Sequence, residues 1–298
     1  MIPLSLLWNL ALVQSFSSTL SKRFRPCASR QWKHHRSNVH EMIPVAIVVD
    51  IYPYSMRDEI ASKFPTSHKI VHMVRHAEGT HNVNEDYRSE QQLDARLTEK
   101  GVQQCEELAK QRWNSRDTTN VVITSTMTRC LQTALLSFPS MKTFVAHESL
   151  RETVNFVCDK RRSVTEIAKD FPMVDFTAVV DDEDPIWRAY EDRLGDVWEH
   201  PRESADLVNV AARGRTFFQF LRDSCPANEV VVCTHSAFLR CILNWGYGVP
   251  MKPPQILGGE EEVHPVVRYC GDKEWEEQMR ASYENCELRS MVVVFPLE

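Results

Sequence analysis

The stretch HKIVHMVRHAEGTHN, from His68 to Asn82, decides how the rest of the chain is interpreted. Its apolar run from Ile70 to Val74, interrupted only by His72, is typical of a strand that is covered on both faces. The run ends in Arg75 and His76, a guanidinium beside an imidazole. Because ligands of open α/β sheets bind at the carboxyl ends of the strands, this pair indicates a site.

Four further apolar runs rich in Val and Ile read as strands, at residues 120–125, 143–147, 229–234 and 289–296. Between them lie helical patterns at residues 97–113, 128–138, 206–223 and 236–246. This alternation predicts an α/β fold of three layers, a mostly parallel open sheet with helices on both faces. Residues 173–204 fit no regular pattern and contain the acidic run DDEDP, so we expect an irregular insertion there.

The first 40 residues differ from the rest because they contain no Asp or Glu and are rich in Ser, Lys and Arg. Such a leader is typical of an organelle or secretory presequence, and a disordered extension is the alternative. Its apolar run from Met1 to Val13 is shorter than the ~20 residues that span a bilayer. We assign residues 1–66 to an N-terminal extension and 67–298 to one domain. The expected location is the cytoplasm, or an organelle if residues 1–40 are a presequence.

Composition narrows the class of protein. The net charge of −6 disfavours a nucleic-acid binder, which needs a basic face. The 9 cysteines are scattered without a CxxC pair, which favours reduced thiols over structural disulfides. His72 and His76 form an HxxxH spacing, but a strand does not bring residues i and i+4 together as a zinc-binding helix does. We therefore expect no metal and no cofactor, and the oligomeric state is left open.

Charged groups recur at the ends of the other predicted strands. Arg129 follows the second strand, Glu148 and Glu152 follow the third, and Thr234-His235 ends the fourth. Arginine forks bind phosphate oxygens bidentately, a neutral histidine is a nucleophile, and a carboxylic acid can protonate a leaving alkoxide. Catalysis of phosphoryl transfer consists mainly of positioning and charge stabilisation, so this set of groups predicts that reaction.

The motifs together resemble those of the histidine phosphatase (phosphoglycerate-mutase-like) superfamily. RHAEGTHN resembles its RHG signature, with Ala77 in place of the usual Gly. Further motifs follow in matching order, namely LTEKG (97–101), STMTRCLQTA (125–134) and CTHSAFLRCIL (233–243). The segment LRETVNFVCDKRRS (150–163) resembles a branch known from plants and fungi. The resemblance covers roughly residues 68–245 and implies a phosphoglycerate-mutase-like fold.

The resemblance also implies catalytic roles, carried over by position. His76 would be the phosphorylated nucleophile and His235 a second catalytic histidine. Glu152 matches the position of the proton donor better than Glu148, although the two lie four residues apart.

Other positions would contact the substrate. The phosphate-binding residues implied are Arg75, Asn82, Arg129 and His235. Two further positions have two interpretations each: His81 either lines the pocket or caps the loop, and Arg161 either belongs to a solvated basic face or contacts a second anionic group of the substrate. The acidic DDEDP run is expected to be a solvated loop.

These inferences predict metal-independent hydrolysis of a small phosphomonoester through a phosphohistidine on His76. A phosphoglycerate-type phosphomutase is the first alternative, because it uses the same intermediate but retains it until the product rebinds. A non-catalytic phospho-ligand binding protein is the second. Such a protein usually lacks the nucleophile or an arginine, and this chain keeps them all.

Overall fold

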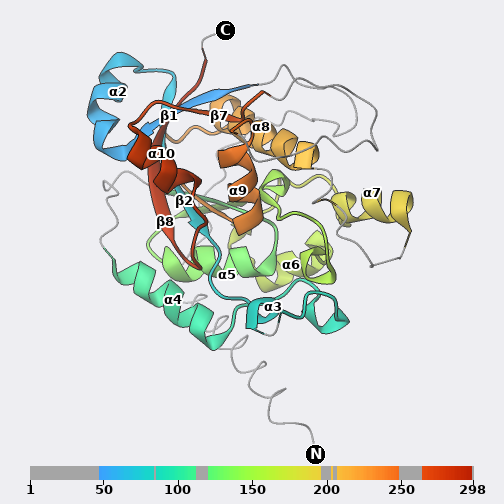
Figure 1. Ribbon diagram of the computed structural model, residues 1–298. Coiled ribbons are helices and arrows are strands. Elements are labelled where there is room, and N and C mark those ends of the chain that lie inside the picture. Colours follow the sequence, from blue (N-terminus) through green and yellow to red (C-terminus); the bar gives the residue numbers. More distant parts are fainter. Residues whose placement is uncertain are drawn as a thin grey trace, which may run out of the picture.

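The computed structural model describes residues 47–83, 85–111, 120–195, 203, 207–247 and 264–296. The predicted presequence in residues 1–40 lies outside these ranges. Within them, eight strands form one sheet in the spatial order β5-β4-β3-β6-β2-β8-β1-β7 (Figure 1). The five strands predicted from the sequence are confirmed as members of this sheet.

Five neighbouring strands of the sheet are parallel. In spatial order they are β5 (Val174–Asp175), β4 (Thr143–Ala146), β3 (Val121–Thr124), β6 (Glu229–Thr234) and β2 (His68–Arg75). Their register pairs Arg75 with Thr234 and Cys233 with Thr124. The carboxyl ends of β2, β6 and β3 are therefore level with one another.

The other half of the sheet departs from this pattern. Strand β8 (Leu288–Val294) lies between β2 and β1 (Val49–Pro53) and runs antiparallel to both. Strand β7 (Val267–Tyr269) then pairs in parallel with β1. The last strand along the chain is thus an interior member of the sheet.

Helices cover both faces of the sheet, which confirms the three-layer prediction. One face packs on α8 (Leu207–Asp223), α9 (Ser236–Asn244) and α10 (Lys273–Arg280). The other packs on α2 (Arg57–Lys63), α4 (Glu99–Lys110), α5 (Thr128–Ser137) and α6 (Val164–Asp170). The short α3 (Thr80–Val83) follows β2.

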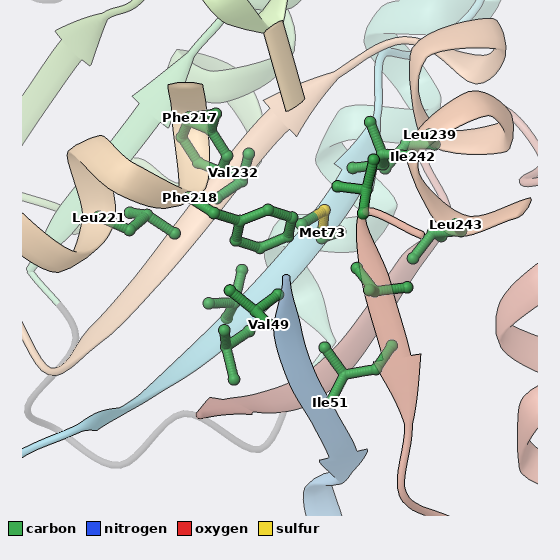
Figure 2. Packing of buried hydrophobic residues seen from close by; sticks show 14 of the residues in the cluster. Val49, Ile51, Met73, Phe217, Phe218, Leu221, Val232, Leu239, Ile242 and Leu243 are labelled. Atoms are coloured by element: carbon green, nitrogen blue, oxygen red, sulfur yellow. The ribbon is translucent and has the colours of Figure 1, made fainter. Parts of the chain in front are cut away.

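Side chains that alternate between the two faces of the sheet contribute to a hydrophobic core on each face. In β6, Val230 and Val232 face the α8 and α9 layer, whereas Val231 and Cys233 face the opposite layer. Figure 2 shows the first core, where Phe218 of α8 lies close to Met73 of β2. A strand buried on both faces carries no polar alternation, which is why these runs are recognisable from the sequence.

Two expectations about the domain need correction. The boundary at residue 67 falls too late, because β1 and α2 precede it and β1 is hydrogen-bonded to strands on both sides. The pairing partners of β1 are residues 267–269 and 291–294. Because these residues are far away in the chain, the sequence around β1 does not reveal the pairing.

The segment 173–204 is also more regular than expected in its described part. It contains β5 and α7 (Pro185–Leu194), and the Oδ1 atom of Asp184 accepts the Trp187 N–H at 2.9 Å to cap that helix. The end of the DDEDP run is therefore a helix start, with Asp at the N-cap and Pro at the first helical position.

Candidate active site

Three strand ends meet at one edge of the sheet. His76 follows β2, Ser125 follows β3 and His235 follows β6. The His76 N–H donates to the Thr234 carbonyl at 2.8 Å. The Ser125 N–H likewise donates to the Cys233 carbonyl at 2.9 Å. The parallel register therefore brings residues from distant motifs to one place.

The His76 ring is buried and held in one tautomer. Its Nδ1 atom lies 2.7 Å from the carbonyl oxygen of Ala77. A carbonyl oxygen only accepts, so Nδ1 carries the proton and Nε2 keeps its lone pair. Burial, together with the nearby Arg129 and His81, holds the pKa of His76 well below its ordinary value. The imidazole is therefore neutral, the form that acts as a nucleophile.

The Ala77 position tolerates its methyl group. Ala77 has a negative φ, so the backbone does not require glycine there. Its N–H donates to the Thr133 hydroxyl at 3.0 Å, which ties the loop after β2 to α5.

Arg129 and His235 form a buried pair beside His76. The Nε atom of Arg129 donates to Nδ1 of His235 at 3.3 Å. This contact places the His235 proton on Nε2, which lies 2.9 Å from the Ser125 hydroxyl oxygen. The ring centroids of His76 and His235 are 5.1 Å apart. Burial and then Arg129 lower the pKa of His235 well below its usual value, so it is a neutral donor.

The start of α5 and the turn η4 (Val157–Asp159) fix the Arg129 guanidinium. Nη1 donates to the Cys158 carbonyl at 2.7 Å, and Nη2 lies 3.2 Å from Asp159 Oδ1. Burial raises the pKa of Asp159, and Arg129 opposes that shift. Asp159 and Ser125 both lie in the quoted motifs. The contact of Asp159 with Arg129 and that of Ser125 with His235 depend on the fold, so the sequence analysis did not predict them.

Arg75 and His81 carry nitrogen atoms without partners. Arg75 Nη1 donates to the Tyr283 carbonyl at 2.7 Å, while its buried Nε has no acceptor within the described residues. The buried Nδ1 of His81 likewise lacks a partner there. Burial, then Arg129 and Arg75, lowers the pKa of His81 to about 2. Buried polar atoms are normally hydrogen-bonded, so these two nitrogens are candidate contacts for a polar ligand or for water.

Asn82 closes the loop after β2. Its Oδ1 atom accepts the Gly79 N–H at 3.0 Å, and its own N–H donates to the Gly79 carbonyl at 2.9 Å. The structure thus gives Asn82 a loop-shaping contact, and its expected contact with phosphate stays a prediction.

The two candidate proton donors have different surroundings. Glu152 Oε1 accepts the Phe238 N–H at 2.9 Å, and Oε2 accepts the Ala237 N–H at 3.2 Å, in the first turn of α9. This anchors Glu152 next to His235, whose position directly precedes that helix. Burial, and then Asp159, raise the pKa of Glu152.

Glu148 instead belongs to a group of ion pairs outside this set. Its Oε1 atom accepts from Arg151 Nη1 at 2.6 Å, and Arg161 Nε donates to both of its oxygens at 3.2 Å. The geometry therefore separates two residues that the sequence could not separate.

Arg161 does not reach the site, which corrects the interpretation in which it contacts the substrate. Its Nε binds Glu148, and its four remaining donors bind backbone carbonyls. These carbonyls belong to residues 162, 181, 182 and 183. All five N–H donors are occupied, so the side chain has none left for an anion.

A row of aromatic rings leads away from His76. The His81 ring lies 5.6 Å from His76 and 6.2 Å from Tyr87. Tyr87 stacks on Phe156 with centroids 5.7 Å apart, and the exposed Arg88 lies 5.5 Å above Phe156. No spacing in the sequence links Tyr87 to Phe156, so this row was also missed. It offers an apolar face beside the polar cluster.

The described residues contain no group of three or more His, Cys, Asp or Glu side chains arranged to hold a metal ion. None of their helices combines the length and apolar character needed to cross a bilayer.

Comparison with known proteins places the chain in a family. Residues 71–275 match the model of the histidine phosphatase superfamily, branch 1. A phosphoglycerate mutase-like protein of Arabidopsis thaliana is 32% identical over 266 residues, which covers 76% of this chain and 84% of that protein. Phosphoglycerate mutase-like protein 1 of the same plant is 30% identical over 265 residues, covering 76% and 81%.

A solved mycobacterial glucosyl-3-phosphoglycerate phosphatase in complex with VO3 aligns with a TM-score of 0.42 and 16% identity. That alignment covers 77% of this chain and 98% of the other. From the family match and the plant relatives, the chain belongs to the histidine phosphatase superfamily, branch 1, and is an enzyme of the phosphoryl-transfer class.

Proposed function

We propose that this protein is a phosphomonoester phosphatase that works through a phosphohistidine on His76. The observation that carries the proposal is the neutral, buried His76, which lies beside Arg129 and His235 and whose own Nε2 has no hydrogen-bond partner among the residues that the structure describes. Arg75 adds a second guanidinium, and its Nε, which has no partner in the described part of the chain, is a donor for a phosphate oxygen. Together these groups supply the positive charge and the donors that a transferring phosphoryl group needs.

The proposed reaction has two steps. First, Nε2 of His76 attacks phosphorus, the bond from phosphorus to the ester oxygen breaks, and Glu152 gives its proton to the leaving alkoxide. Then water attacks the phosphohistidine, the N–P bond breaks and returns the lone pair to Nε2, and the Glu152 carboxylate takes the proton from water. The raised pKa of Glu152 supports the first step, because it favours the protonated acid.

A phosphoglycerate-type mutase is the second candidate, favoured by the names of the plant relatives, which are called phosphoglycerate mutase-like. A mutase uses the same first step but hands the phosphoryl group to a second hydroxyl of the substrate. The two functions therefore differ in the acceptor of the phosphoryl group, which is water in a phosphatase and a substrate hydroxyl in a mutase.

Turnover without a priming bisphosphate tests the proposal. We expect the protein to release inorganic phosphate from members of a phosphomonoester panel, in EDTA and without bisphosphoglycerate, because two arginines supply the charge that a metal would supply. Vanadate should inhibit as a five-coordinate mimic of the transferring phosphoryl group. Isomerisation of phosphoglycerate with little phosphate release would favour the mutase. Loss of turnover in EDTA that zinc or magnesium restores would contradict the arginine-based site.

The pH dependence gives an independent test. Since the pKa of His76 is held well below 6.5, the nucleophile stays neutral as the pH falls from 7 through 6.5. Glu152 must be protonated, and its acid form is lost as the pH rises through its raised pKa. We therefore expect kcat for an alkyl phosphate to hold or rise on acidification and to fall on the alkaline side, and Glu152→Gln to remove the alkaline fall. A decline of kcat centred near pH 6.5 on acidification would contradict a neutral His76.

A further inference from the structure

The segment that carries Glu152 belongs to no helix or strand. Residues 151–155 run between β4 and η4, and four of the five are buried. A buried backbone without regular structure must find its hydrogen-bond partners elsewhere, because an unpaired buried N–H or carbonyl group is costly. The partners of this segment therefore determine where the Glu152 carboxyl lies.

One arginine of α8 binds two consecutive carbonyl groups of this segment. Arg213 Nη1 donates to the Arg151 carbonyl at 3.3 Å, and Nη2 donates to the Glu152 carbonyl at 3.2 Å. A guanidinium is planar and presents its donors in a fixed arrangement. Arg213 therefore fixes the backbone of Glu152 relative to α8.

Glu203 binds Arg213 and the next part of the same segment. Its Oε2 atom accepts from Arg213 Nη2 at 2.8 Å and from the Val154 N–H at 2.7 Å. Its own N–H donates to Asn155 Oδ1 at 2.9 Å. The Glu203 side chain is buried, and that of Arg213 is 13% exposed. The Arg213–Glu203 pair thus binds the backbone on both sides of the Glu152 side chain.

Helix α9 fixes the other end of Glu152. The N–H groups of Ala237 and Phe238 donate to its two carboxyl oxygens. Glu152 is therefore held at its backbone by a side chain of α8 and at its carboxyl by the first turn of α9. A shift of the backbone would pull the carboxyl away from that turn.

We propose that Arg213 and Glu203 are positioning residues that hold the Glu152 carboxyl beside His235, so that proton transfer to the leaving oxygen depends on them. The geometry of the pair is independent of the reaction. Its effect on rate rests on the proposed function, in which Glu152 is the proton donor.

The pair also leaves little net charge near Glu152, because Arg213 and Glu203 form an ion pair. Charged or titratable groups also interact with Glu152 from the elements around it, namely Asp159 and Cys158 of η4, Arg129 and Cys130 of α5, Arg75 of β2 and Cys241 of α9. The three thiols and the neighbouring His235 are neutral, because burial raises the pKa of the thiols and lowers that of the imidazole. An Arg213 charge without its partner would add to the two guanidinium groups and lower the pKa of Glu152.

Turnover of two esters tests the proposal. Arg213→Lys keeps the positive charge but replaces the planar fork with a compact ammonium group, which cannot span both carbonyls and the carboxylate. We expect kcat for glycerol 2-phosphate, whose alkoxide needs a proton, to fall by about 10- to 100-fold, the scale of a displacement of about 1 Å. The kcat for para-nitrophenyl phosphate should change far less, because its phenolate leaves without a proton. KM should stay close to wild type for both esters.

Glu203→Gln separates the position of Glu152 from the charge of the pair. One oxygen of Glu203 accepts both bonds, so the single oxygen of Gln can still bind Arg213 and the Val154 N–H. The position of Glu152 should be kept while the balancing negative charge is lost. An unbalanced positive charge favours the carboxylate, so the acid form of Glu152 is lost at lower pH. We therefore expect near-wild-type kcat at acidic pH and an alkaline fall for glycerol 2-phosphate that begins at lower pH.

Arg280→Lys is the matched control. Arg280 also binds a backbone carbonyl and a carboxylate, those of Tyr247 at 2.7 Å and Glu276 at 2.9 Å, and its partners lie outside residues 151–155. This variant should leave the ratio of kcat for the two esters unchanged, even where its melting temperature falls.

Amide hydrogen exchange tests the geometry whatever reaction the protein catalyses. Arg213→Lys should speed exchange in residues 151–155 and in the first turn of α9, and Arg280→Lys should not. Unchanged exchange in Arg213→Lys would overturn the pair as the support of this segment. Where Glu152→Gln lowers the ratio of kcat and Arg213→Lys does not, or Arg213→Lys slows both esters equally, the positioning role is overturned. A failure of Glu152→Gln itself to lower that ratio would instead overturn the proposed proton donor.

Discussion

Replacing His76 with Ala should lower kcat by about 10⁴- to 10⁶-fold, the range seen when an enzyme loses a member of its nucleophilic machinery. The reason is that, in the proposed mechanism, the lone pair of His76 Nε2 accepts the phosphoryl group, while the Nδ1 proton is bound to the Ala77 carbonyl. Brief incubation of the wild-type protein with labelled substrate should leave acid-labile, base-stable phosphate on the chain, and the variant should carry none.

His147→Asn is a matched control for this experiment. His147 is also a histidine at the end of a sheet strand, but its Nδ1 is engaged by the Ser149 N–H at 3.3 Å and by the Ser149 hydroxyl at 2.6 Å. This variant should still be labelled. Persistent labelling of His76→Ala would mean that another residue is the nucleophile.

The second large effect concerns the proton donor. Glu152→Gln should slow the hydrolysis of alkyl phosphates by about 10²- to 10⁴-fold, the usual contribution of a positioned acid. Aryl phosphates with an electron-poor ring should stay much closer to wild type, because their phenolate leaves without a proton. The side-chain oxygen of Gln can still accept the Phe238 N–H, whereas its NH₂ group cannot accept the Ala237 N–H, so the change removes the proton with little change of volume. The ratio of kcat for the two substrates is the quantity to measure.

Glu148→Gln is the control that the chain itself supplies. Glu148 pairs with the buried Arg151 and Arg161 and lies outside the His76 cluster. Its replacement should lower the free energy of unfolding by about 1–3 kcal/mol, the scale of hydrogen bonds to charged groups. Both substrates should be affected alike and mildly. If the two variants exchange these behaviours, Glu148 is the donor. If both lose the two substrates equally, the donor lies elsewhere.

The strand ends were predictable because a buried parallel strand needs a continuous apolar run. The first charged residue after such a run therefore marks the end of the strand in the sequence. The prediction from strand ends places four residues near one another, and the structure brings the same four together: Arg75, His76, Arg129 and His235. Motif position favoured Glu152 over Glu148, but spacing alone did not separate them, since a helical spacing of four would place both on one face. The chain instead forms the short turn η3 (Glu148–Leu150) and then leaves helical geometry, so the two carboxylates diverge.

The features that could not be predicted from the sequence, the contacts of Arg161 and the pairing of β1, depend on long-range geometry. The contacts of Arg161 require the carbonyls of residues 181–183 to turn inward, and a loop conformation of that kind has no compositional signal. The pairing of β1 with β7 and β8 requires residues more than 200 positions apart, such as Val49 with Val267. Short strands of this kind acquire their register from their partners rather than from their own pattern.

The interior position of β8 has a consequence for synthesis on the ribosome. Residues 288–294 follow every other strand of the described sheet in chain order, yet they fill the gap between β2 and β1. Until they emerge, the growing chain can assemble β2, β6, β3 and β4, and the free side of β2 remains an unpaired edge that can template aggregation. The nascent protein therefore stays incomplete at the strand that positions Arg75 and His76 until β8 has left the ribosome.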